Sequence, residues 1–112
     1  MRFRAVHRYA KISPKKARLI VDMIRGKRVN DALHILRRVP RRGSYFVDKV
    51  LRSAIANADE SLQADMESLV VAEAFVDSGP QRRKWLPRAR GMATPIIKRQ
   101  SHITVIVADE SE

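Results

Sequence analysis

Cysteine is absent from this sequence of 112 residues, which excludes a disulfide bond and a thiolate metal site. Long apolar runs are absent too, because no segment reaches the roughly 18 residues that a membrane-spanning helix needs. We therefore expect no signal peptide, no membrane partner and a cytoplasmic location. Glycine is scarce, with four residues, and none of them stands in a phosphate-binding loop of the P-loop or dinucleotide type.

Acidic residues are also in short supply. The chain has 12 acidic against 23 basic residues, which gives a net charge of +11 and a pI near 11.1. An isolated domain with this surplus would repel itself, whereas a bound polyanion would neutralise it. A membrane surface is the competing partner, but the missing apolar segments disfavour it. The composition therefore predicts one small domain, residues 1–112, that binds nucleic acid.

The charge is unevenly distributed along the chain. Residues 1–52 carry a net charge of +13, residues 53–79 carry −6, residues 80–102 carry +7 and residues 103–112 carry −3. This pattern predicts one face or end turned to nucleic acid and another turned to solvent. The alternative is that the acidic residues of positions 59–77 only solvate the end of a helix.

Two short helices are expected in the first half of the chain. The first lies between Ser13, whose hydroxyl can accept a hydrogen bond from a free N–H of the first turn, and Gly26, which takes the left-handed turn that ends a helix. The second spans residues 30–38, with Asn30 as its cap. Apolar residues recur at spacings of three and four in both segments, so each helix should bury one face.

The remaining pattern predicts one more helix and three strands. Residues 44–58 follow the helical apolar spacing, with Ser44 as the cap or a start a few residues earlier. Residues 2–12 suit an edge strand or an extended arm, and residues 68–77 and 102–108 alternate regularly between two faces. The order of one strand, three helices and two strands predicts an α+β fold: a three-stranded, antiparallel sheet with three helices on one face.

The most informative segment is residues 79–102, between the last two expected strands. It contains seven basic residues, no acidic one, three prolines and the only tryptophan, Trp85. So long a connection inside a small domain is usually functional or disordered, and its apolar residues argue against simple disorder. We expect a long protruding β-hairpin arm with its tip near residues 88–91. Trp85 is better suited to stacking on nucleotides than to a contact within the hairpin.

The basic residues favour phosphate contacts as a group. Lys15, Lys16 and Arg18 adjoin the free N–H groups at the start of the first helix, which makes that end a favourable phosphate seat. Arginine outnumbers lysine five to two in the arm. A guanidinium group binds phosphate with two parallel hydrogen bonds and stacks on bases, whereas an ammonium group acts as a point charge.

A catalytic or metal site is not expected. His7, His34 and His102 fall in different elements without metal-binding spacing, although His7 and His102 could contact a phosphate or a base edge. The carboxylates of residues 59–77 lack the Asp/Asn alternation and the turn glycine of a calcium loop. The sequence also contains no Gly-x-Ser-x-Gly elbow. We therefore expect no enzyme activity and no cofactor.

Several motifs of the chain occur together in one known family. They are SPKKARL (13–19), IRGK (24–27), SAIANA (53–58), FVD (75–77), GP (79–80), PRARG (87–91), KR (98–99) and SHITV (101–105). The chain resembles the bacterial form of the ribosomal protein L twenty-two family of the large subunit, over positions from about 5 to 107.

The resemblance implies three helices on a three-stranded antiparallel sheet, and a long hairpin that lines the peptide exit tunnel. It implies binding and bridging of large-subunit rRNA, with neighbouring ribosomal proteins, the nascent peptide and macrolides as further contacts. The positions near the tunnel constriction would be Arg83, Lys84, Pro87, Arg88, Arg90 and Gly91, followed by Lys98 and Arg99 on the returning strand. Departures from the family pattern are Arg82, Trp85, Met92 and the pair at residues 94–95, which we expect to interrupt the returning strand.

The complete set of RNA-binding candidates combines both arguments. It consists of Arg4, His7, Arg8, Lys11, Ser13, Lys15, Lys16, Arg18, Arg25, Lys27, Arg82, Arg83, Lys84, Trp85, Pro87, Arg88, Arg90, Gly91, Lys98, Arg99 and His102. Two other functions stay open on the residues alone: an architectural protein with a proline-containing arm in the DNA minor groove, and a small RNA-processing enzyme built around a histidine. The resemblance favours rRNA over DNA.

Overall fold

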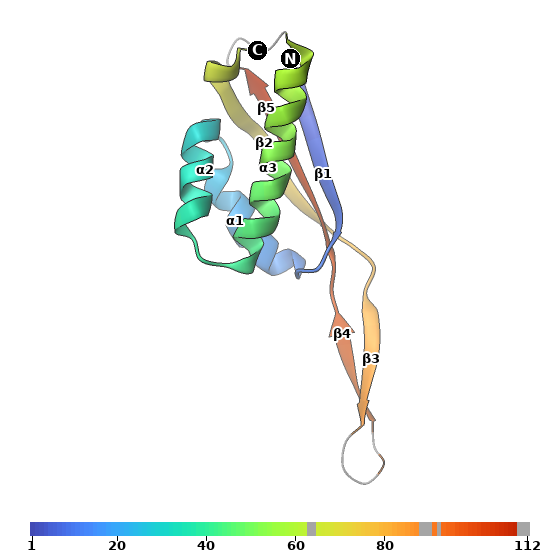
Figure 1. The fold of residues 1–112 in the computed structure, drawn as a ribbon. Helices are drawn as coiled ribbons and strands as arrows, with labels where there is room; N and C mark the ends of the chain where they lie inside the picture. Colours follow the sequence, from blue (N-terminus) through green and yellow to red (C-terminus); the bar gives the residue numbers. More distant parts are fainter. Residues whose placement is uncertain (63–64, 88–90, 92, 110–112) are drawn as a thin grey trace.

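The computed structural model describes residues 1–62, 65–87, 91 and 93–109. Within these ranges the helices are α1 (Pro14–Ile24), α2 (Val29–Arg38) and α3 (Arg42–Ser61), with a 3₁₀ turn η1 (Met66–Ser68). The strands are β1 (Arg2–Ala10), β2 (Leu69–Ser78), β3 (Arg82–Pro87), β4 (Ala93–Lys98) and β5 (Ser101–Asp109). Figure 1 shows a body of helices and strands from which the β3–β4 hairpin extends.

The body is an antiparallel sheet of three strands in the order β1-β5-β2, with the three helices on one face. This confirms the α+β prediction. The central strand, β5, is the most completely buried because it has a neighbour on each side. β1 is an edge strand, as one of the two sequence-based alternatives proposed, and it ends at Ala10 rather than at residue 12.

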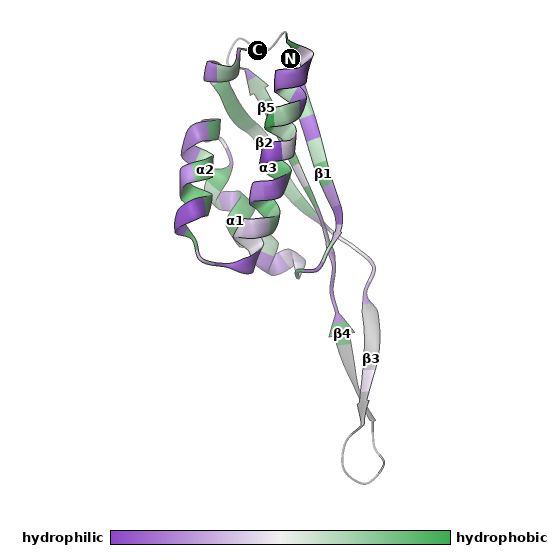
Figure 2. Ribbon diagram, viewed as in Figure 1, coloured by the Kyte–Doolittle hydropathy of each residue, from purple (hydrophilic) through white to green (hydrophobic). Residues whose placement is uncertain are grey.

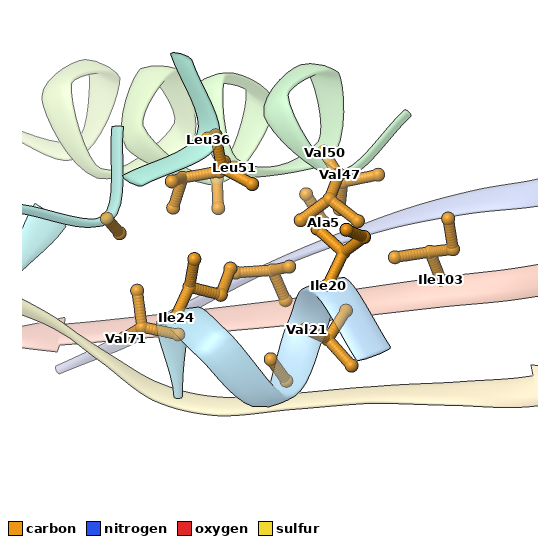
Figure 3. Close-up of a cluster of buried hydrophobic side chains, with 14 of the residues drawn as sticks. Ala5, Ile20, Val21, Ile24, Leu36, Val47, Val50, Leu51, Val71 and Ile103 are labelled. Carbon is orange, nitrogen blue, oxygen red and sulfur yellow. The ribbon is translucent and has the colours of Figure 1, made fainter. Parts of the chain in front are cut away.

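The core lies between the helices and this sheet. Helix α3 packs over β1 and β5, α1 packs over β2, and α2 packs against the other two helices. Figure 3 shows Ile24 of α1, Leu51 of α3 and Ile103 of β5 among the side chains that converge there, and all three are fully buried. Complete burial of such side chains contributes about 1.5 to 3 kcal/mol each. Figure 2 shows the polar residues of α2 on its outward side.

The three expected helices are confirmed, but their caps differ from the prediction. Ser13 is the N-cap of α1, yet its side chain makes no capping hydrogen bond. Arg28 rather than Asn30 precedes α2, and Arg41 rather than Ser44 precedes α3. Ser44 lies inside α3 and is buried, so core packing decides its place. Gly26 follows α1 with a φ of +79°, as expected of a glycine that ends a helix.

The regular alternation predicted for β2 is wrong at its centre. Val71 pairs with Val107, but Glu73 rather than Ala72 pairs with Ile106, so Ala72 is an extra residue in a β-bulge. The bulge moves the buried side of the strand from odd to even positions, from Val71 to Ala74 and Val76. A single inserted residue reverses the faces of a strand, because side chains alternate with a period of two.

The predicted arm is a separate two-stranded sheet, in which Arg82 pairs with Lys98 and Pro87 pairs with Ala93. The molecule measures 64 × 25 × 17 Å, and its radius of gyration of 17.2 Å exceeds the roughly 13 Å expected of a compact chain of this length. The expected interruption at residues 94–95 is wrong, since Pro95 pairs with Trp85 within β4. Both strands of a two-stranded ribbon are edges, where proline is tolerated.

Candidate nucleic-acid interface

The base of the hairpin meets the beginnings of α1 and α3 in a groove of about 520 Å³. Three segments of the chain contribute to it: the turn before α1 together with the first turns of α1, the start of α3, and the end of β4 with the residue after it. Six of its residues are basic: Lys11, Lys16, Arg41, Arg42, Lys98 and Arg99. We call this hollow the basal groove. Its cations converge where the arm leaves the body. A concave site lined by charges of one sign concentrates the electrostatic field, so the groove should attract a folded polyanion more strongly than a flat surface with the same charges would.

A second hollow of about 410 Å³ lies beside the basal groove and shares Ser13, Lys16 and Arg99 with it. It adds Lys15 from the first turn of α1, together with Gln81, just before β3, and Gln100, between β4 and β5. The first N–H groups of an α-helix have no partner within the helix. The predicted phosphate seat at the start of α1 therefore adjoins the arm, which the sequence alone did not indicate.

Gly79 fixes the approach of the two strands at the arm's base. Its N–H donates to the carbonyl oxygen of Gln100 at 2.9 Å. A Cβ atom at this position would lie 3.2 Å from that oxygen and 3.3 Å from the Cβ of Gln100. A side chain at this position would therefore force Gln100 to shift by a few tenths of an ångström.

Ser101 ties the same region to the core. It is completely buried, and its hydroxyl donates to the carbonyl oxygen of Ile12 at 2.6 Å. Ile12 precedes α1, so this bond joins the start of the helix to the point where β4 becomes β5. The basal groove is built on a fixed support as a result.

Two of the candidate arginines have partners within the protein. Arg18 donates from Nε and Nη2 to the carbonyl oxygen of Val76, at 3.3 and 3.0 Å. Arg25 donates from Nε and Nη2 to the carbonyl oxygen of Ala74, at 3.1 and 2.6 Å, and from Nη1 to Asp22 at 2.7 Å. Both guanidinium groups therefore cover the outer edge of β2. Their contact with RNA stays a prediction beside this structural role.

The candidates on β1 and β5 are not among the residues that line the basal groove. His7 packs its ring against Phe46 of α3 at 5.5 Å between centroids. His102 accepts a hydrogen bond at Nδ1 from the backbone N–H of Tyr9, at 3.1 Å. Arg4 and Arg8 are exposed on β1, and Lys27 is exposed after α1. These residues do not join the six cations of the basal groove, so RNA contacts there would be separate ones.

The arm carries the remaining candidates. Trp85 is 63% exposed, which is consistent with a residue outside the main core. Strand β3 contains Arg82, Arg83, Lys84 and Pro87. Gly91, near the expected tip, has a φ of +73°. Arg88, Arg90 and Met92 lie outside the described residues.

Sequence reasoning missed Arg41 and Arg42 of the basal groove. They follow Pro40 as a basic pair, and they precede the helix that was expected to start near Ser44. An earlier start of α3 would have brought them to its first turn. The signal that could have revealed them is their position directly after Pro40. A proline ends one helix and often precedes the next, so a basic pair that follows it can fall in the first turn of that helix.

The negative charge gathers at the other end of the body. Asp59 and Glu60 lie in the last turn of α3, and Asp65 and Glu67 lie at η1. Figure 1 shows η1 and the C-terminal end of α3 at the end of the molecule opposite the arm. Four of the six acidic residues of positions 53–79 thus lie at this end, whereas Glu73 and Asp77 lie on β2, and the orientation of the two ends toward nucleic acid and solvent stays a prediction.

Sites of other kinds were also sought. In the part of the chain that the structure describes, no group of three or more His, Cys, Asp or Glu residues is arranged to hold a metal ion. None of the described helices is long and apolar enough to cross a membrane.

Comparison with known proteins decides the family. The family described as "Ribosomal protein L22p/L17e" matches residues 5–108, nearly the whole chain. The chain belongs to this ribosomal protein family. The match agrees with the resemblance that the motifs predicted, and the family range includes the basal groove and the arm.

Curated relatives of the family match at full length. The large ribosomal subunit protein uL22 of Syntrophobacter fumaroxidans is 50% identical over 110 residues, covering 98% of this chain and 100% of the relative. The uL22 proteins of Pelotomaculum thermopropionicum and Carboxydothermus hydrogenoformans are each 51% identical over 112 residues, covering 100% of this chain and 99% of each relative.

Proposed function

We propose that this ribosomal protein is a structural constituent of the large ribosomal subunit in the cytoplasm, and that it binds and bridges large-subunit rRNA without catalysis. Its membership of the L22p/L17e family supports the subunit assignment. The observation that carries the RNA-binding role is the basal groove, whose six cations come from three separate segments at the root of the arm.

The mechanism would be neutralisation and bridging. The cations of the basal groove would hold phosphates of one RNA segment, while the arm would reach a second segment beyond the body. The molecule is 64 Å long, so a single chain can span RNA helices that do not touch each other. Bidentate arginine contacts would fix the orientation of the RNA.

The arm is also proposed to line the peptide exit tunnel, where the nascent peptide and macrolides would pass its tip. The resemblance of residues 87–91 to the family motif supports this role. The shape supports it too, because a two-stranded ribbon is narrow enough to enter a channel between RNA helices. Neighbouring ribosomal proteins would contact the body rather than the arm.

Co-sedimentation tests the subunit assignment. A tagged form of the protein, expressed in a bacterium, should travel with large subunits through a sucrose gradient. If about ten phosphates are neutralised, the logarithm of affinity for purified large-subunit rRNA should fall with that of salt concentration at a slope of roughly −7 to −9. Equal affinity for duplex DNA and rRNA would contradict the proposal and favour the DNA-binding alternative.

Deletion of residues 82–84 tests the tunnel role separately. We expect the body to remain folded and the macrolide response of cells carrying the variant to change. Unfolding of the free protein on this deletion would show that these residues belong to the core rather than to the arm.

A further inference from the structure

We propose that Tyr9 and His102 form a nucleobase-stacking site, in which the Tyr9 ring receives an unpaired base of RNA and His102 positions that ring. This inference rests on the proposed RNA-binding function and adds a base contact to its phosphate contacts. The site lies where β1 leaves the sheet, next to the root of the arm.

The backbone of β1 is irregular at this point. His7 pairs with Ile103 and Ala10 pairs with Ser101, so two residues, Arg8 and Tyr9, lie opposite His102 alone. This is a β-bulge, and bulges redirect a side chain away from the regular alternation of a strand. Because β1 is an edge strand, the redirected ring of Tyr9 has open space to occupy.

The conformation of Tyr9 is unfavourable on its own. Its φ of +59° lies in the left-handed region, which bulky side chains rarely adopt. The backbone N–H of Tyr9 donates to Nδ1 of His102 at 3.1 Å, and this bond holds the residue in place. Since Nδ1 accepts, the imidazole must carry its proton on Nε2. Strained residues of this kind cluster at functional sites, where the surrounding structure maintains them.

The ring of Tyr9 is fixed but not covered. It meets the His102 ring edge to face, with centroids 4.9 Å apart and planes at 87°. Tyr9 nevertheless remains 57% exposed. Stacking of a base requires an aromatic ring that is immobilised and accessible at once, and stacking is tolerant of base identity because every base has a flat face.

The surrounding charges favour a base over a phosphate at the ring itself. Asp77 of β2 lies opposite His102 in the sheet and is exposed, so its carboxylate would repel a phosphate placed beside His102. The same carboxylate can accept a hydrogen bond from an exocyclic amino group of a base. The exposed cations Arg8 and Lys11 flank Tyr9 along the chain and would take the phosphates on either side.

The test compares the binding of two single-stranded nucleic-acid probes, one that has bases and one that lacks them. The probes are a fluorescent oligoadenylate of 12 nucleotides and an abasic ribose-phosphate strand of the same length. Tyr9→Asn removes the ring but keeps a residue that tolerates the left-handed region, and Tyr9→Phe keeps the ring. We expect Tyr9→Asn to weaken binding of oligoadenylate about 5- to 150-fold and to leave binding of the abasic strand unchanged. Tyr9→Phe should bind both strands as the unaltered protein does.

An equal loss on both strands, or no loss on oligoadenylate, would overturn the stacking site while leaving the proposed function intact. Failure of the unaltered protein to bind large-subunit rRNA would instead overturn the proposed function. Thermal unfolding shows whether each variant folds, and Tyr9→Asn should be no less stable because it relieves backbone strain.

The positioning role of His102 has its own measurement. As a single substitution, with Tyr9 present, His102→Ala should weaken binding of oligoadenylate, because Tyr9 then loses its hydrogen bond and its ring contact. The same substitution should have no further effect in the Tyr9→Asn background. Additive losses in the double variant would show that His102 acts independently of Tyr9.

Discussion

At the scale of single residues, polar side chains of this protein hold segments that are distant in the sequence. Ser101 binds the carbonyl oxygen of Ile12, and Asn57 of α3 donates to the carbonyl oxygen of Arg4 at 3.0 Å. Such bonds add little when exposed, but a buried one is costly to break because its partner is left without a donor. Ser101, which is completely buried, is therefore the more critical of the two.

Replacement of Ser101 by alanine should lower the free energy of unfolding by about 1 to 3 kcal/mol, because the carbonyl oxygen of Ile12 would remain buried without its donor. Chemical denaturation measures the change. Ser78→Ala is the matched control, since Ser78 pairs with Ser101 across the sheet but is exposed, and it should change stability by less than about 0.5 kcal/mol. Equal effects of the two substitutions would contradict the assigned role of the Ser101 hydroxyl.

The pair Arg18 and Arg25 allows structural and RNA-binding roles to be separated. Replacement of both by lysine keeps the net charge but removes the paired hydrogen bonds to the edge of β2. We expect stability to fall by about 1 to 2 kcal/mol, with the salt dependence of rRNA binding unchanged. Weaker binding at unaltered stability would mean that these guanidinium groups contact RNA instead.

At the scale of elements, the contact between α1 and α3 depends on the absence of a side chain. A Cβ atom on Gly43 would lie 3.0 Å from Cγ1 of Ile20 and 3.1 Å from Cδ1 of Ile12. The start of α3 is therefore pressed against α1 at the floor of the basal groove, which both helices line. This contact links the packing of the helices to the spacing of the groove's cations.

Gly43→Ala should destabilise the protein by about 1 to 3 kcal/mol through overpacking. It should also weaken rRNA binding, since Arg41 and Arg42 would move with the displaced start of α3. Thermal unfolding and filter binding measure the two effects. Ser53→Ala, on the exposed side of the same helix, should leave both nearly unchanged. An unchanged stability of Gly43→Ala would contradict the prediction and would show that the side chains of Ile12 and Ile20 can move to accommodate the added methyl group.

Periodicity predicted each helix and strand of the body because the buried stripes are long, as in the apolar series of α3. The sequence predicted the start of α1 after Ser13, but not the starts of α2 and α3, because packing rather than Asn30 or Ser44 decides where those two helices begin. The bulge at Ala72 was equally inaccessible, since the sequence of β2 alternates smoothly through it. Of the candidate site, composition identified the arm and the start of α1. The convergence with Arg41 and Arg42 follows only from tertiary packing.

At the scale of the whole molecule, the body and the arm have separate tasks. The core cluster among the described residues ends at Val76 and resumes at Ile103. The arm between these positions is a two-stranded sheet of its own, and it extends the molecule to a length of 64 Å. We therefore expect folding of the body and ordering of the arm to be independent, with the arm stabilised by RNA contact.

Replacement of residues 82–98 by a two-residue turn tests this separation. The midpoint of thermal unfolding should change by only a few degrees, because Trp85 and Ile97, the large apolar residues of the segment whose side chains the structure describes, are exposed. Six basic residues are lost, so the slope of rRNA affinity against salt should become shallower by about 4 to 5. A collapse of stability would show that the arm supports the body. An unchanged slope would show that the arm makes no phosphate contacts.

The division between core and arm also affects how the sequence can vary. A substitution in the buried cluster alters the stability of the protein, and hence the fraction of folded chains, whether or not a binding partner is present. We expect a substitution in the arm, between positions 82 and 98, to leave the fraction of folded chains nearly unchanged and to affect mainly the binding of RNA. The sequence of the arm can thus change, and its binding with it, while the buried cluster and the fold of the body stay the same.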